Sequence, residues 1–518
     1  MNAALERASW PQRMAMAAVA MGLGGAQAAA LAWPWGGQPV WWLQLLSLAG
    51  LGALLQRTAS ARQAAGLGWC FATAWLSATF WWLFISMHTY GGLPAVLAVL
   101  AVLALAGFLA LYYALAAWAW RRWRTTALRS VLLFAACWTL AELARGTLWT
   151  GFPWGAGGYA HVEGPLAVLP RWLGVYGTGA IAALIAIVFS YAHAIPWRTA
   201  RPAVGALTVV ALWGGAYWSQ QQAQEAPGRA PVRVALLQGN IAQDEKFIPG
   251  AGIREALQWY GQQLMAPAAD LVVAPETALP LLPQQLPAGY WEAITAPYQT
   301  GASPHAALVG MPLGNEVEGY TNSVVGWRPE EMPKYRYDKH HLVPFGEFVP
   351  PLFHWFVRMM NIPLGDFARG SVGQASMAWR GERWAPNICY EDLFGEELAA
   401  RFRVADQAPT VFVNVSNIAW FGDSIAIDQH LQISRMRALE FERPMLRATN
   451  TGATVVIDHR GAVTAALAAH TRSVLVAQVQ GRDGVTPFAR WVSWLGLWPL
   501  WLCCMALVIW AARSRKQY

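Results

Sequence analysis

The chain has 518 residues, of which 56% are hydrophobic and only 13% charged, and its mean hydropathy is +0.30. Because soluble domains carry about 25% charged residues, this composition excludes a protein that is solvated by water alone. The net charge of +8 does not indicate a nucleic-acid partner, because the basic residues gather in short loops between apolar runs.

Eight apolar runs are candidates for membrane-spanning helices, which need about 20 residues each. Their approximate bounds are 13–33, 40–56, 66–87, 94–119, 130–148, 168–194, 204–219 and 491–511. The second and seventh runs are short, and the first resembles a signal peptide, but the spans behind it favour an uncleaved helix. We therefore predict a membrane domain of seven helices over residues 1–219, and a last helix with a short tail over residues 491–518.

The charges of the loops predict the orientation of these helices. Lysine and arginine mark the N-terminus, every second loop and the C-terminus: Arg7, Arg13, Arg57, Arg62, Arg121, Arg122, Arg124, Arg129, Arg198, Arg201, Arg513, Arg515 and Lys516. Short loops rich in these residues stay in the cytoplasm. Both termini are then cytoplasmic, and seven preceding helices put residues 220–490 on the outer face of the membrane.

Residues 220–490 have the pattern of one α/β domain. A polar linker near residue 220 is followed by short, β-branched runs that predict buried strands, and two stretches between them have a helical pattern. The strands are expected at 232–237, 271–274, 307–310, 410–415 and 455–458, and the helices at 253–265 and 430–443. The aromatic, proline-broken segment 344–370 is either part of the core or a loop that meets the membrane surface.

The chain has five cysteines, and Cys389 is the one outside the predicted spans. It is either an inert core residue or a nucleophile. It follows an apolar run and precedes Glu391 and Asp392, which predicts a turn from a strand into a helix. Such a turn displays its side chain at the end of a sheet, so we favour the nucleophile.

Two other residues could activate this thiol. Glu276 follows the run 271–274 and could act as a general base, although a carboxylate there is also typical of a helix cap. Lys339 could stabilise negative charge or be an ordinary surface lysine. The adjacent His340 and His341 allow a Cys–His pair instead, or a metal site, but neighbouring side chains on a strand point to opposite faces.

The order Glu276, Lys339, Cys389 resembles the catalytic triad of the nitrilase superfamily. The stretches 417–422 and 447–452 are also similar to that superfamily. Together with seven preceding spans, and with the stretches 150–154, 238–241, 339–347 and 389–391, the chain resembles the apolipoprotein N-acyltransferase family over nearly its whole length. The resemblance implies a membrane helical bundle of about eight helices with an extracytoplasmic α-β-β-α sandwich of the nitrilase type.

The resemblance implies that Glu276 is the general base, Lys339 the charge stabiliser and Cys389 the acyl carrier. It also implies supporting roles for four further residues, namely Phe247, Glu347, Tyr390 and Glu391. A phospholipid would give its sn-1 acyl chain to Cys389, and the amine of a diacylated apolipoprotein would then take it from the thioester. We expect an enzyme in a bacterial inner membrane with its catalytic domain in the periplasm, surrounded by membrane lipid, monomeric and without cofactor or metal.

Alternatives remain at the level of the sequence. A membrane-tethered amidase or nitrilase would use the same triad, and a lipid transporter would instead need buried ionisable residues in its spans. Glu142 is the main such candidate; it could pair with Arg145 one helical turn later, the reading that we favour, or it could bind a lipid headgroup. Two positions depart from the family pattern: Ile418 stands where many relatives have Asp, and Phe247 where Trp is common.

Overall fold

The computed structural model describes residues 10–191, 229–299, 304–329, 334–350, 353, 355 and 366–514. The chain divides into two compact units. The helical unit contains Met1–Trp81, Val96–Glu225 and Leu495–Tyr518, and the α/β unit contains Trp82–Ala95 and Ala226–Trp494. The predicted linker near residue 220 and the predicted span 204–219 lie outside the described residues.

The helices of the helical unit coincide with the predicted apolar runs. They are α1 (Trp10–Leu31), α2 (Trp41–Gln56), α3 (Ala61–Phe80), α5 (Ala95–Trp123), α6 (Ala127–Thr147), α7 (Pro170–Ser190) and α15 (Trp498–Ser514). Of the described helices, four are long and apolar enough to cross a membrane, or up to six if two broken pairs each form one span. Several apolar helices are thus confirmed, and the count of eight spans stays a prediction.

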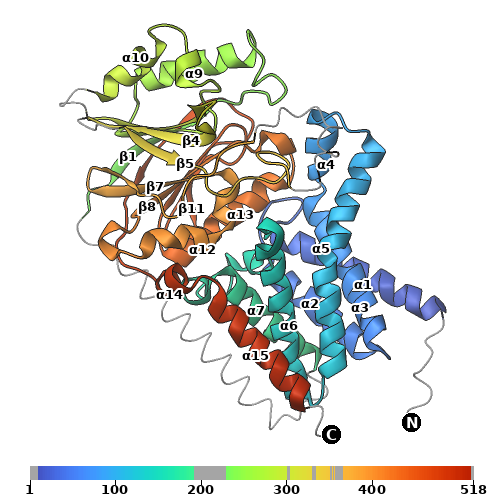
Figure 1. The fold of residues 1–518 in the computed structure, drawn as a ribbon. Helices are drawn as coiled ribbons and strands as arrows, with labels where there is room; N and C mark the ends of the chain where they lie inside the picture. The colour runs from blue at the N-terminus through green and yellow to red at the C-terminus, as the bar shows by residue number, and fades with distance from the viewer. Residues whose placement is uncertain are drawn as a thin grey trace. The chain divides into compact units, whose positions relative to one another are not determined.

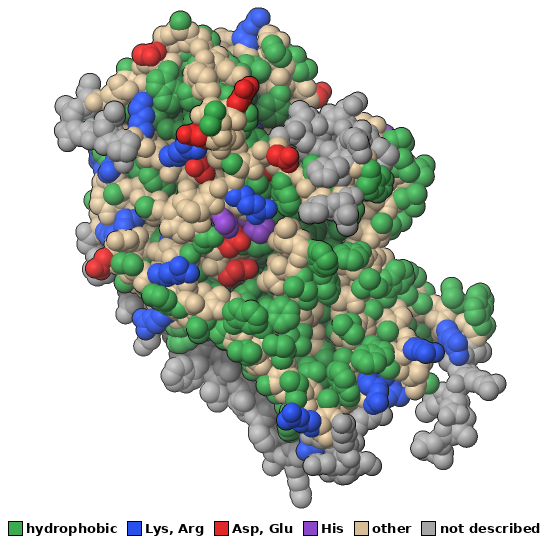
Figure 2. Space-filling view, in the orientation of Figure 1, with side chains coloured by type: hydrophobic (Ala, Val, Ile, Leu, Met, Phe, Trp, Pro, Cys, Tyr) green, Lys and Arg blue, Asp and Glu red, His purple; other side chains and the backbone are tan. Residues whose placement is uncertain are grey.

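The surface of the helical unit is apolar over much of its length. Figure 2 shows hydrophobic side chains crowded over this unit, with Lys and Arg gathered at its lower edge. In α5 the exposed residues include Leu97, Leu100, Phe108, Leu111 and Leu115. An apolar surface of this extent is typical of contact with lipid.

Inside the helical unit, small residues bring helices close and aromatic rings fill the space between them. A Cβ atom on Gly24 of α1 would lie 2.2 Å from the backbone oxygen of Phe71 in α3, a close approach typical of membrane helices. The ring of Trp138 stacks on that of Trp75, with centroids 6.0 Å apart. Close approach at small residues and packing of aromatic rings thus contribute to the order of the bundle.

The predicted ion pair between Glu142 and Arg145 is wrong. Within the described residues, Glu142 Oε1 accepts a hydrogen bond from the Gly157 N–H at 3.0 Å. Arg145 instead donates to the Tyr113 hydroxyl at 2.9 Å and to the backbone oxygen of Trp154 at 2.8 Å. Buried backbone groups in the stretch that follows α6 bind both side chains, since each backbone group would otherwise lack a partner.

The α/β unit contains two six-stranded sheets. The first has the order β12-β1-β2-β3-β4-β5 and the second β11-β10-β9-β8-β7-β6. The strands of the first sheet are β1 (Val232–Gln238), β2 (Leu271–Ala274), β3 (Ala306–Asn315), β4 (Gly319–Trp327), β5 (Tyr335–Asp338) and β12 (Ser473–Val479). Those of the second are β6 (Met377–Trp379), β7 (Glu382–Ile388), β8 (Val411–Ser416), β9 (Met445–Thr449), β10 (Val455–Ile457) and β11 (Val463–Ala466).

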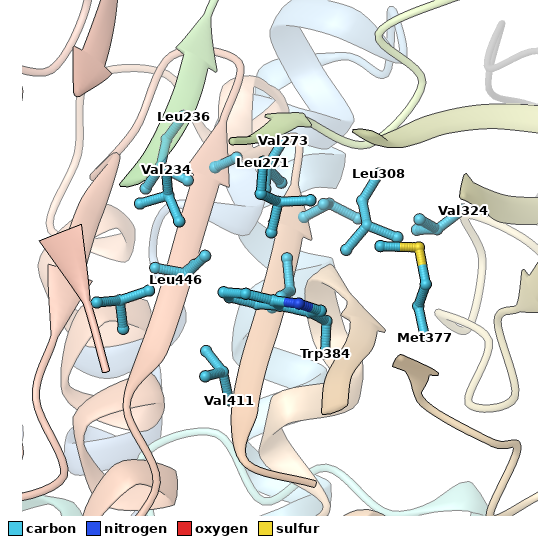
Figure 3. Close-up of a cluster of buried hydrophobic side chains, with 14 of the residues drawn as sticks. Val234, Leu236, Leu271, Val273, Leu308, Val324, Met377, Trp384, Val411 and Leu446 are labelled. Atoms are coloured by element: carbon cyan, nitrogen blue, oxygen red, sulfur yellow. The ribbon is translucent and has the colours of Figure 1, made fainter. Parts of the chain in front are cut away.

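The two sheets face one another across a hydrophobic core, and helices cover their outer faces. Figure 1 shows α9 (Gly252–Met265) and α10 (Tyr290–Thr295) over the first sheet, and α12 (Gly395–Leu398) and α13 (Ala426–Phe441) over the second. Side chains alternate along a strand, so Val234 and Leu236 of β1 point into the core between the sheets (Figure 3), whereas Ala235 and Leu237 pack under α9 and α10. The predicted α-β-β-α sandwich is confirmed.

Parallel pairing at the centre of each sheet brings strand ends together. In the first sheet β1 pairs with β2 and β2 with β3 in parallel, and in the second β7 pairs with β8 and β8 with β9 in the same way. The carboxyl ends of parallel strands lie at one edge of a sheet, where open α/β folds bind their ligands. This edge therefore determines where functional side chains can meet.

A short segment between α3 and α5 belongs to the α/β unit. It contains α4 (Leu83–Ile85) and the π-helix η1 (Ser86–Tyr90). The indole of Trp82 donates to Gln429 Oε1 of α13 at 3.0 Å, and its ring lies 4.2 Å from that of Phe421. Tyr90 meets the Trp420 ring edge to face at 5.8 Å. These contacts fix the segment on the stretch that follows β8.

Candidate active site

The three residues of the predicted triad each follow the end of a strand. Glu276 lies two residues beyond β2, Lys339 directly follows β5, and Cys389 directly follows β7. Cys389 has a φ of 52° and Thr277, next to Glu276, a φ of 46°. Backbone in this region costs about 1 to 3 kcal/mol for such residues and is found mainly at functional sites.

The Glu276 carboxylate is buried and accepts three hydrogen bonds. Oε1 accepts from Asn322 Nδ2 at 2.7 Å and from Lys339 Nζ at 3.4 Å, and Oε2 accepts from the Asn417 N–H at 2.8 Å. Burial alone would raise the pKa of this carboxyl, but Lys339, Asn322, Lys246 and the Asn417 N–H lower it below its ordinary value. Glu276 is therefore ionised at neutral pH, as a general base must be.

Lys339 is held between two carboxylates. Besides Glu276, its Nζ lies 2.9 Å from Glu347, and Asn322 Nδ2 bridges the two acids by donating to both, at 2.7 Å each. Burial would lower the pKa of Lys339, but Glu347, Glu276 and Cys389 raise it above its ordinary value. Lys339 thus remains a cation beside the thiol, and Glu347 orients it.

Cys389 is partly buried, and its thiol is protonated at rest. Burial and the charge of Glu276 raise the pKa of the thiol to about 12, and Lys339 and the Ser416 hydroxyl offset only part of that rise. The structure therefore contains a thiol that must lose its proton during attack rather than before it. A neighbouring ionised carboxylate supplies the acceptor for that proton.

Glu391 joins the two loops that carry Lys339 and Cys389. Its Oε1 accepts from the N–H groups of His340 at 2.6 Å and His341 at 3.2 Å. Its Oε2 accepts from the Ile388 N–H at 2.6 Å and from the Tyr337 hydroxyl at 2.8 Å. With four donors on one carboxylate, Glu391 links the two loops and positions the residues on them.

The remaining predicted residues occupy the surroundings of the site. Tyr390 is buried, with its ring 5.3 Å from that of Phe394. Phe247 is 41% exposed, so its aromatic ring is available to a substrate at the surface.

The two adjacent histidines have separate partners. His340 Nδ1 lies 2.7 Å from the Gly370 oxygen, and His341 Nδ1 lies 3.0 Å from Glu397 Oε1. Both rings are thus held by groups other than the thiol. The ranges that the structure describes contain no group of three or more His, Cys, Asp or Glu residues that could hold a metal ion.

Three residues of the site were not predicted from the sequence. Asn322 lies in the polar run 321–323 of the otherwise apolar strand β4, which was a usable signal. Asn417 was noted as part of a motif but without a role. Lys246 is 2% exposed and donates to the backbone oxygen of Glu276 at 3.2 Å, and nothing in the sequence distinguishes it from a surface lysine.

A buried polar network that includes Asn414 and His430 contacts the backbone carbonyl of Cys389. The Cys389 carbonyl accepts from Asn414 Nδ2 at 3.2 Å and lies 3.3 Å from His430 Nε2. The same His430 nitrogen lies 2.9 Å from Asp392 Oδ1, and Arg447 Nη2 lies 2.7 Å from His430 Nδ1. Because Arg447 can only donate, Nδ1 accepts and Nε2 carries the proton. His430 therefore contacts the backbone of the nucleophile and fixes its position.

Comparisons with known proteins cover both units. A family model described as apolipoprotein N-acyltransferase N-terminal domain matches residues 25–188, and one described as carbon-nitrogen hydrolase matches residues 233–486. The chain is 58% identical to an apolipoprotein N-acyltransferase of Verminephrobacter eiseniae over 518 residues, 95% of each chain. It is 49% identical to the one of Ralstonia nicotianae over 456 residues, which cover 87% of this chain and 86% of that relative. Among solved structures, a carbon-nitrogen hydrolase from Helicobacter pylori is 14% identical, with a TM-score of 0.35, over 53% of this chain and 95% of that one.

Proposed function

This chain belongs to the apolipoprotein N-acyltransferase family, and we propose that it transfers the sn-1 acyl chain of a membrane phospholipid to the N-terminal amine of a diacylated apolipoprotein. The enzyme is an acyltransferase that acts in lipoprotein maturation. The proposal assigns the chemistry to Glu276, Lys339 and Cys389. The observation that supports it is the hydrogen-bonded set of Glu276, Lys339 and Glu347, together with the positive φ of Cys389 directly after β7.

In the first half-reaction the thiol attacks the ester carbonyl of the phospholipid. Glu276 takes the thiol proton as the carbon–sulfur bond forms, and Lys339 stabilises the negative charge on the ester oxygen. When the carbon–oxygen bond breaks, the lysophospholipid oxygen takes the proton from Glu276 and leaves. The acyl chain remains on Cys389 as a thioester.

In the second half-reaction the neutral amine of the apolipoprotein attacks the thioester. The carbon–nitrogen bond forms, the carbon–sulfur bond breaks, and the surplus proton of the amine passes through Glu276 to the departing thiolate. This restores the protonated thiol that the raised pKa of Cys389 favours at rest. Both substrates carry lipid chains, which gives a reason for a catalytic unit to be joined to apolar helices.

The location of the reaction follows from the charge pattern of the loops. We propose that the α/β unit faces the periplasm of a bacterial inner membrane and that both termini are cytoplasmic. We further propose that the enzyme acts as a monomer.

The test is the intact mass of the protein after exposure to phospholipid vesicles. An increment of one acyl chain is expected, which hydroxylamine removes and which a diacylated lipopeptide discharges to give a triacylated product. Cys389→Ala should show no increment, with Cys503→Ala as the matched control. Labelling that persists in Cys389→Ala would refute the acyl carrier, and release of free fatty acid or ammonia in place of triacylated product would favour the membrane-tethered amidase.

A further inference from the structure

Lys246 lies in the loop that follows β1 and faces inward against the pattern of its neighbours. It is 2% exposed, whereas Asp244, Glu245 and Phe247 are exposed. A lysine is rarely buried unless a carboxylate pairs with it, and within the described residues Lys246 forms no salt bridge. Its hydrogen bond there goes to the backbone oxygen of Glu276, at 3.2 Å.

The loop holds Lys246 in this position through several fixed points. At one end, the Ile241 N–H donates to Asn450 Oδ1 at 3.0 Å, and Asn417 Nδ2 donates to Gln243 Oε1 at 2.8 Å. At the other end, a Cβ atom on Gly252 would lie 2.7 Å from the Cα of Lys246, so only glycine allows this close approach. The inward position of Lys246 is thus built into the loop.

The charge of Lys246 interacts with those of Glu276 and Cys389. Burial lowers the pKa of Lys246 to about 8, while Glu276 and Cys389 act to raise it. Lys246 is therefore mostly charged at neutral pH and below, the range in which Glu276 titrates. A free energy of interaction is shared by both partners, so the ammonium favours the ionised form of Glu276 to the same extent.

We propose that Lys246 is a positioning residue for the general base: its ammonium holds the backbone of Glu276 and keeps the Glu276 carboxylate ionised beside the protonated thiol. This inference rests on the proposed role of Glu276. Lys339 contacts the same carboxylate from the end of β5. Glu347 shares the contacts with Asn322 and Lys339, and its negative charge acts against the ionised form of Glu276. Glu276 thus interacts with two cations, one in the loop that follows β1 and one directly after β5.

The variants Lys246→Met and Lys246→Arg separate charge from packing, because Met keeps the apolar stem and Arg keeps the charge. The measurement is the single-turnover rate of Cys389 acylation by phospholipid vesicles from about pH 3 to 7, because the pKa of Glu276 lies below the ordinary value of a carboxyl group. In Lys246→Met the acidic limb of the rate profile should move to higher pH by about 0.5 to 1 unit, and in Lys246→Arg it should stay with the wild type. A Lys246→Met limb that coincides with the wild type, or an equal loss in both variants at every pH, would overturn the inference.

Glu276→Gln separates this inference from the proposed function. If Glu276→Gln keeps an acidic limb, the assignment of the base fails, whatever Lys246 does. If it abolishes acylation while Lys246→Met matches the wild type, only the role of Lys246 fails. Should Lys246→Met not fold, competitive reductive methylation of Lys246 supplies the reciprocal test: the pKa of Lys246 should fall in Glu276→Gln, and an unchanged value would refute the coupling.

Discussion

At the scale of single residues, the proposed site assigns nucleophilic attack and proton acceptance to different side chains, Cys389 and Glu276. The thiol of Cys389 is not activated by a low pKa, because burial and the charge of Glu276 raise its pKa to about 12. The proton acceptor is instead kept ionised by Lys339 and by hydrogen bonds. A nucleophile of this kind stays inert until a substrate excludes water and attack moves its proton to Glu276.

Alkylation of Cys389 by iodoacetamide should therefore depend steeply on pH. With a pKa of about 12, roughly one thiol in ten thousand is ionised at pH 8, and the rate should rise about tenfold per pH unit as protons are removed. A cysteine introduced at Val317, which is 95% exposed, is the control and should reach its plateau near pH 9 to 10. A plateau for Cys389 below pH 9 would contradict the raised pKa.

Glu391→Gln should slow acylation of Cys389 by about 100-fold. The amide group would face backbone donors where two carboxylate oxygens now accept four hydrogen bonds, and a loss of about 3 kcal/mol corresponds to about two orders of magnitude in rate. Glu397→Gln is the matched control, since Glu397 contacts only the ring of His341 among these groups. Equal rates in both variants would show that Glu391 does not position the site.

At the scale of elements, the site depends on where strands end and on what packs against the loops beyond them. Strands β1, β2, β3, β8 and β10 were predicted because each contains a short apolar run. The contribution of β4 was missed, because its polar run 321–323 is unusual for a buried strand. The segment with α4 and η1 continues an apolar run, so the sequence assigned it to a membrane helix, whereas its aromatic contacts place it in the α/β unit.

Trp82 should anchor that segment. Trp82→Ala is expected to lower the free energy of unfolding by about 3 to 5 kcal/mol, because it leaves a cavity beside Phe421. Trp82→Phe should cost about 1 kcal/mol, because it keeps a ring and loses the hydrogen bond to Gln429.

The measurement is denaturation of the detergent-solubilised protein, in which unfolding of the α/β unit is monitored by its susceptibility to proteolysis. The neighbouring Trp81 is 45% exposed, so Trp81→Ala is the control and should change the free energy by less than about 0.5 kcal/mol. An equal effect of Trp81→Ala and Trp82→Ala would mean that the segment is not held through Trp82.

At the scale of the whole molecule, composition distinguishes the helical unit, whose surface is apolar and suited to lipid, from the α/β unit, whose apolar residues are buried. The helical unit exposes apolar residues over much of its surface, and the α/β unit buries its apolar residues between and outside two sheets. The loop charges then predict which side of the membrane the site occupies.

That orientation can be tested with single cysteines and a membrane-impermeant maleimide on intact cells. Val317→Cys in the β3–β4 hairpin should be labelled from outside. Thr126→Cys, in the Arg-rich loop between α5 and α6, should be labelled only after lysis. The reverse pattern would overturn the predicted topology, and labelling of both from outside would indicate a different number of spans.

The sequence by itself determined the apolar helices, the α/β unit and the candidates Glu276, Lys339 and Cys389. Hydrophobic runs, loop charges and short strands are local properties of the chain, so they can be recognised in the sequence without knowledge of the fold. The ion pair predicted for Glu142 and Arg145 failed because spacing along a helix says nothing about the backbone groups that compete for each side chain.

Only the tertiary structure decided how the candidate side chains act on each other. Glu276 is held by Asn417, which lies 141 residues away, and by Lys246 from a third loop. The raised pKa of Cys389, the four bonds of Glu391 and the inward position of Lys246 all arise where distant strand ends meet. Burial and electrostatic interaction depend on distances in space, and these distances cannot be read from the spacing of residues in the sequence.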